Sequence, residues 1–171
     1  FLFSAGMGDK IGYFYAMQGV VALFMPALMG IVADRWIPAQ KLLAGCHLLT
    51  ALFKAGMGYV ALSATDMVAD EYPTLLLLYA LSVAFFMPTL ALSNSVSYTA
   101  LESVKLDPVK SFPPIRVFGT IGFICSMIAT DVLGFQASYN QFFLSAALGL
   151  MAAGYALTLP PCPVSKHQES K

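Results

Sequence analysis

Long apolar runs alternate with short polar breaks along most of the chain. A helix needs about 20 mostly apolar residues to cross the roughly 30 Å hydrocarbon core of a bilayer, and unpaired backbone groups make loops too costly there. Five windows have this length, and they cover approximately residues 12–33, 42–62, 74–98, 115–133 and 139–159. The pattern therefore predicts an all-α membrane protein with five transmembrane helices.

The breaks between these windows are too short to hold a soluble domain. Their sequences are DRWIPAQK, SATDMVADEYP, ESVKLDPVKSFPP and GFQAS. The first ten residues, FLFSAGMGDK, lack the basic region and cleavage site of a signal peptide. They have the pattern of a helix end followed by a loop, so we expect at least one further helix upstream.

Composition supports a membrane protein and excludes several other classes. The chain is 58% hydrophobic and 11% charged, with a mean hydropathy of +0.75, whereas soluble domains carry about 25% charged residues. The net charge is zero, which gives no indication of a nucleic-acid partner. Cys46, Cys125 and Cys162 are far apart and form no CxxC pair, so we expect reduced thiols, no metal site and no cofactor.

The distribution of lysine and arginine predicts the orientation, because these residues accumulate on the cytoplasmic side. If the C-terminus is cytoplasmic, the outer segments hold Lys10 alone. The inner segments then hold Arg35, Lys41, Lys105, Lys110, Arg116, Lys166 and Lys171, while Asp9, Asp66, Asp70, Glu71 and Asp131 fall on the outer side. The first complete helix is therefore predicted to run from outside to inside.

The stretch MGIVADRW, residues 29–36, lies at the inner end of the first window. Gly30 would allow close helix approach, and Asp34 and Arg35 would place opposite charges in a short loop just beyond the membrane. This loop is either a solvated turn with a topogenic arginine or an inner gate that docks on neighbouring helix ends. The pattern GxxxDR resembles the loop signature of the major facilitator superfamily, although WIP follows here where that signature continues with glycine and basic residues.

The stretch SFPPIRVFGTIGF, residues 111–123, places an arginine at the start of the fourth window. At 100° per residue, Arg116, Thr120, Phe123, Met127 and Thr130 share one stripe of a helix. Five guanidinium donors, a hydroxyl and a flat ring suit a planar polar ligand. The alternative is an interfacial arginine that snorkels toward the headgroups.

Two further features surround this stripe. Gly119, Gly122 and Ser126 form a neighbouring strip of small residues suited to helix packing. A helix N-terminus repels a cation, so Arg116 is expected to need an acidic or electron-rich partner.

Several polar residues lie inside other windows and leave two interpretations open. Lys54 and His47 share a face and could form a proton relay, or Lys54 could snorkel. Gln18 and Asn94 could bond neighbouring helices or line a cavity. Pro26 and Pro88 predict kinks in their helices.

Three motifs, MPALMGIVADRW, FMPTLALSNSVSY and FPPIRVFGTIGF, closely resemble the bacterial nucleoside:proton symporters of the major facilitator superfamily. The resemblance covers nearly the whole chain. It implies that residues 1–160 are a partial N-terminal six-helix half, with the first helix largely missing. Residues 161–171 would begin a central cytoplasmic linker, and the C-terminal half of the transporter would be missing.

The resemblance also implies a function and a site. It implies a carrier in the bacterial inner membrane that imports nucleosides coupled to protons, with Arg116, Thr120 and Phe123 binding the nucleoside and Gly30, Asp34 and Arg35 at an inner gate. A carrier for sugars or other small polar solutes is the alternative. An enzyme is not expected, because the chain has only two histidines and neither HExxH nor GxSxG.

Overall fold

The computed structural model describes residues 1–64 and 68–162, and these contain five long helices. All five are long and apolar enough to cross a membrane, which confirms the predicted fold class. They are α1 (Ile11–Arg35), α2 (Ala39–Ser63), α3 (Tyr72–Ser103), α4 (Pro108–Val132) and α5 (Asn140–Leu157), with short 3-10 turns η1 (Gly8–Lys10) and η2 (Val68–Glu71).

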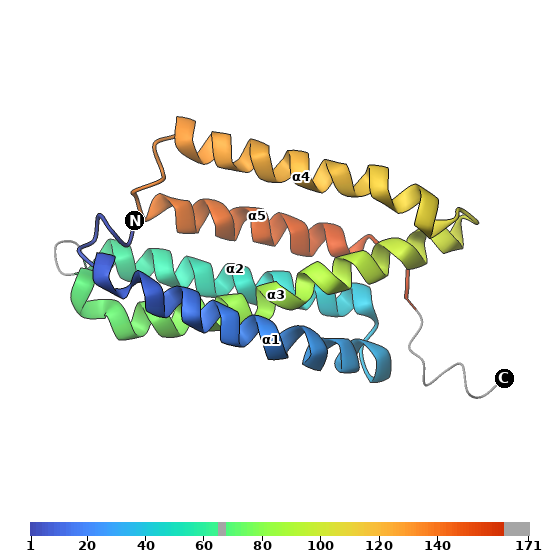
Figure 1. Cartoon of the computed structure of the whole chain (residues 1–171), viewed down its shortest axis with the longest axis horizontal. Coiled ribbons are helices and arrows are strands. Elements are labelled where there is room, and N and C mark those ends of the chain that lie inside the picture. The colour runs from blue at the N-terminus through green and yellow to red at the C-terminus, as the bar shows by residue number, and fades with distance from the viewer. Residues whose placement is uncertain (65–67, 163–171) are drawn as a thin grey trace.

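Four of the helices pack together, and the fifth lies apart (Figure 1). Helix α2 packs along both α3 and α5, and α1 packs along α3. We call α1, α2, α3 and α5 the four-helix group. Helix α4 meets α3 near the connection between them and runs beside the group without packing along it.

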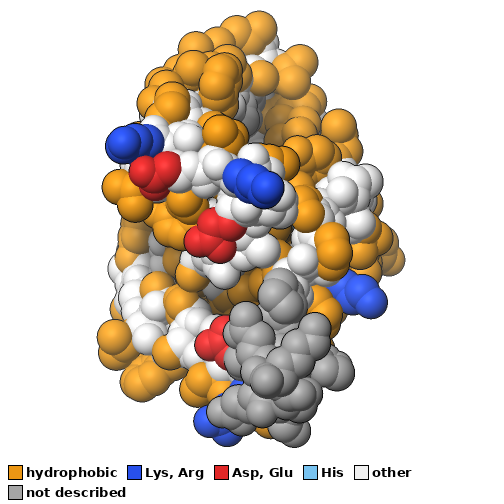
Figure 2. Space-filling model, turned by 90° about the vertical axis from the view of Figure 1, so that its right-hand side faces the viewer, with side chains coloured by type: hydrophobic (Ala, Val, Ile, Leu, Met, Phe, Trp, Pro, Cys, Tyr) orange, Lys and Arg blue, Asp and Glu red, His pale blue; other side chains and the backbone are white. Residues whose placement is uncertain are grey.

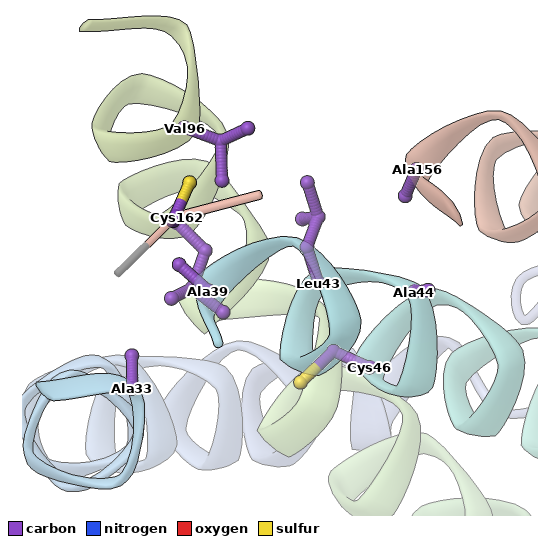
Figure 3. Packing of buried hydrophobic residues seen from close by; sticks show 9 residues of the cluster. Ala33, Ala39, Leu43, Ala44, Cys46, Val96, Ala156 and Cys162 are labelled. Carbon is purple, nitrogen blue, oxygen red and sulfur yellow. The ribbon is translucent and has the colours of Figure 1, made fainter. Parts of the chain in front are cut away.

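Small residues hold the four-helix group together at the end where α1 ends and α2 begins, which we call the inner end. The inner cluster (Figure 3) consists of Ala33, Ala39, Leu43, Ala44, Cys46, Leu92, Val96, Ala156 and Cys162. Because lipid is as apolar as leucine, membrane helices associate through close packing, which small side chains permit. The cluster joins all four helices of the group to the segment that follows α5.

The contact between α2 and α5 is close enough to depend on glycine. A Cβ on Gly58 would lie 2.9 Å from Cζ of Phe143, and a Cβ on Gly149 would lie 3.1 Å from that of Ala51. Carbon atoms in contact prefer separations of about 3.5–4.0 Å. The two helices therefore fit at these levels because glycine occupies positions 58 and 149.

The predicted break ESVKLDPVKSFPP is mostly helical, which corrects the boundaries of two windows. Helix α3 continues to Ser103 and α4 begins at Pro108, so only residues 104–107 connect them. The side chain of Asp107 caps α4 by accepting a hydrogen bond of 3.0 Å from the backbone N–H of Val109. Proline is favoured in the first helical turn, where its missing N–H costs nothing.

Helices α1 and α3 continue through their internal prolines, Pro26 and Pro88.

The charged side chains visible in Figure 2 lie on the inner end of the molecule, surrounded by hydrophobic surface. This end holds the α1–α2 and α3–α4 connections and therefore Arg35, Lys41 and Lys105. Lys166, Lys171, Asp66 and most of the expected linker lie outside the described residues.

Candidate functional site

Arg116 lies well inside α4. Because α4 begins at Pro108, residue 116 is about 12 Å along the helix at 1.5 Å per residue. The prediction that Arg116 lies at the start of its helix was therefore wrong. The predicted repulsion between Arg116 and the N-terminus of the helix therefore does not apply, because that electrostatic effect falls off within the first turn.

The side chain of Arg116 extends toward the C-terminus of α4. Its Nη1 atom lies 2.7 Å from the point that a Cβ on Gly119 would occupy, so the guanidinium has advanced about one turn along the helix. A snorkelling arginine at the inner side of a membrane would extend the other way, toward the N-terminus of α4 and the headgroups. The observed direction is opposite to the one that snorkelling toward the headgroups at this end would need.

Thr120 and Phe123 lie on the same exposed stripe of the continuous helix α4. Phe123 is 65% exposed, and no residue of α4 is buried. The described residues give neither Thr120 nor Phe123 a hydrogen bond or ring contact from outside α4. The aromatic contact between α4 and α3 is made about two turns before Thr120, where the ring centroid of Phe112 lies 4.7 Å from that of Tyr98.

The residues expected at the inner gate are helical. Asp34 and Arg35 form the last turn of α1, and the connection to α2 is residues 36–38, so their placement in a loop was wrong. A Cβ on Gly30 would meet nothing within 4 Å among the described residues, so Gly30 makes no close helix contact there. The neighbouring Ala33 belongs to the inner cluster, which fixes the end of α1.

Two polar residues inside the four-helix group have partners that the sequence did not indicate. Lys54 donates a hydrogen bond of 2.8 Å to Oγ of Ser145 on α5, and its Nζ lies 5.7 Å from the ring centroid of Phe86. Tyr79 on α3 donates a hydrogen bond of 2.8 Å to Oε1 of Gln18 on α1. The bonded partner of Lys54 is thus Ser145 rather than His47, which leaves the proposed relay without a direct link.

A cavity of about 460 Å³ lies in the outer half of the four-helix group. Its lining includes Phe14, Gln18, Tyr79 and Phe142, but no residue of the α4 stripe. Within residues 1–64 and 68–162, no three His, Cys, Asp or Glu side chains are grouped as metal ligands. The stripe on α4 and this cavity are therefore separate features.

Five helices that are long and apolar enough to cross a membrane define a multi-pass membrane protein. The sequence model of the family described as "Nucleoside H+ symporter" matches residues 1–171. The chain belongs to this family.

Relatives and solved structures agree with this assignment. The chain is 43% identical to the xanthosine permease of Escherichia coli K12, over 94% of this chain and 36% of that protein. It is 40% identical to the nucleoside permease NupG of the same organism, over 96% of this chain and 37% of NupG. A crystal structure of a mutant of NupG matches with a TM-score of 0.81 and 38% identity, over 94% of this chain and 38% of that one.

These matches establish the major facilitator fold and a multi-pass location in the bacterial inner membrane. The chain spans less than two fifths of the length of the relatives it matches. The described helices are therefore one part of the architecture found in those proteins.

Proposed function

We propose that the protein to which these helices belong imports nucleosides together with protons by alternating access. The family and the names of the relatives support this function. The observation that carries it in this chain is the exposed Arg116 side chain, which extends along α4 toward the C-terminus of that helix. Substrate is moved without a bond being made or broken, so the protein is a carrier and not an enzyme.

The α4 stripe suits a nucleoside on chemical grounds. The guanidinium of Arg116 offers a planar set of donors for carbonyl or hydroxyl oxygens, and Thr120 offers a hydroxyl that donates and accepts. Phe123 offers a flat face on which a base can stack, a contact worth about 1–3 kcal/mol per base. Since none of these side chains is used to hold the four-helix group together, all three are available to a ligand.

The inner gate is proposed to lie at the end of α1. Asp34 and Arg35 stand in its last turn, beside the inner cluster that fixes Ala33. A rigid helix end carrying opposite charges can make and break contacts as two halves of a carrier rock. Gly30 lies one turn earlier on α1 and belongs to the same segment.

The partners of the α4 surface are proposed to be substrate, lipid and the remainder of a longer carrier, including its C-terminal half. All residues of α4 are exposed or half-exposed in the described chain. In carriers of this kind, sites lie near the membrane midplane between repeats. A stripe that its own bundle leaves uncovered fits such a position.

Uptake of labelled uridine into cells that express the full-length protein tests this function. We expect competition by other nucleosides, no competition by glucose, and loss of uptake when a protonophore collapses the proton gradient. Arg116→Ala should lower uptake about 10- to 100-fold, since hydrogen bonds to charged groups contribute about 1.5–3 kcal/mol. Lys110→Ala, on the first turns of the same helix, is the control.

Inhibition of uptake by sugars and not by nucleosides would support the alternative function, a carrier for sugars or other small polar solutes. Full uptake by the Arg116→Ala variant, with normal expression, would remove Arg116 from the site.

A further inference from the structure

We propose that Gly119 is a positioning residue for the guanidinium of Arg116. The proposal rests on the proposed function, because it concerns how the substrate-binding arginine is held. It assigns to Gly119 a role distinct from the helix packing that its small size suggests.

The geometry depends on the missing side chain at position 119. An added Cβ would lie 2.7 Å from Nη1 of Arg116 and 3.9 Å from its Cζ. Nonbonded heavy atoms are comfortable at about 3.5–4.0 Å, so the guanidinium would have to move by on the order of 1 Å. Glycine thus leaves the space in which the guanidinium lies.

The substitution would move the charge and leave the helix in place. The atom in conflict is at the far end of a flexible side chain, which can turn away at little cost to the backbone. Alanine also has a higher helix propensity than glycine. A change at position 119 should therefore alter ligand contacts while folding stays intact.

Gly122 provides the matched control. It lies on the same helix, one turn further, and a Cβ there would meet nothing within 4 Å among the described residues. If the two glycines serve only as a strip for packing against another helix, alanine should harm both positions alike. If Gly119 acts through Arg116, alanine should affect position 119 alone.

The test compares Gly119→Ala and Gly122→Ala in the full-length protein. We expect Gly119→Ala to raise the KM of uridine uptake about tenfold with a nearly unchanged maximal rate, because a displacement of about 1 Å at a binding group is costly. Its melting temperature should not fall. Gly122→Ala should leave both KM and melting temperature unchanged.

A second background shows whether the effect passes through the guanidinium. Arg116→Lys retains the charge but lacks Nη1, so adding Gly119→Ala to it should change KM less than twofold. Equal harm at positions 119 and 122, a lowered melting temperature, or an undiminished tenfold effect in the lysine background would overturn the proposal. Normal uridine uptake by Arg116→Ala would instead remove Arg116 from the site, and no uridine uptake by the unsubstituted full-length protein would refute the proposed function. Wild-type kinetics of Gly119→Ala beside a defective Arg116→Ala would refute only the positioning role.

Discussion

Helix α4 and the four-helix group use similar residues for different purposes. Ten residues of α2 are buried, whereas α4, of equal length, has none. Glycine at position 58 makes room for the ring of Phe143 across a helix contact, and glycine at position 119 makes room for Arg116 on its own helix. Burial therefore separates the residues that hold the bundle together from the exposed residues of α4, some of which we propose bind a ligand.

The polar side chains show the same division. In the four-helix group, Thr50 donates a hydrogen bond to the carbonyl of Ser82, and Lys54 donates one to Ser145. Polar groups inside a membrane are costly unless they have such partners. The described chain offers no comparable partner on another helix to Arg116 or Thr120, which is why their stripe points to a role outside this bundle.

The largest expected contrast is between two phenylalanines. Phe14 is 4% exposed and lies edge-on to Tyr79, whereas Phe118 on α4 is 72% exposed. Phe14→Ala should destabilise the full-length protein by about 3 kcal/mol, and Phe118→Ala by less than about 0.5 kcal/mol. Thermal melting in detergent measures both, and a large loss with Phe118→Ala would show that another helix covers that face of α4.

A smaller effect is expected from filling the contact between α2 and α5. Gly58→Leu would push against Phe143 and should cost about 2 kcal/mol. Gly45→Leu on the same helix is the control, because a Cβ there would meet no atom of residues 1–64 and 68–162 within 4 Å. Equal melting temperatures for the two variants would contradict the close contact at position 58.

The third prediction concerns the segment after α5. Oε1 of Gln40 accepts a hydrogen bond of 3.0 Å from the backbone N–H of Cys162, and both residues are buried. Gln40→Ala should leave this N–H unsatisfied, at a cost of about 1–2 kcal/mol. Faster labelling of Cys162 by a maleimide would report the release, with exposed Cys125 as the internal reference. Unchanged labelling would count against the anchor.

The smallest effect is expected at the hydrogen bond between α2 and α5. Ser145→Ala removes the acceptor of Lys54 and should cost about 0.6 kcal/mol, the average for such bonds in membranes. In a Lys54→Met background the same change should cost nothing. Equal costs in both backgrounds would show that the bond contributes no coupling.

The sequence was sufficient to predict the number and type of helices, because a membrane span requires a long apolar run whatever its neighbours are. It misplaced the start of α4 because Pro113 and Pro114 suggested a break, although the helix passes through them after its Asp107 cap. Whether the stripe of Arg116, Thr120 and Phe123 faces a cavity stays a prediction.

The partners of polar residues were beyond sequence reasoning for a different reason. Lys54 and Gln18 stood out as polar groups in apolar windows, but their partners Ser145 and Tyr79 are 91 and 61 residues away. Which helices lie side by side decides such pairs. The role that we propose for Gly119 likewise depends on the direction of the Arg116 side chain, which helical periodicity alone does not give.

The hydrogen bond between Gln40 and Cys162 has a mechanical consequence. A pull on the chain beyond Cys162 would reach the beginning of α2 before it reached the end of α5. Tension on that segment would thus be shared between α2 and α5 at the inner end, and α5 would not be detached from the group first.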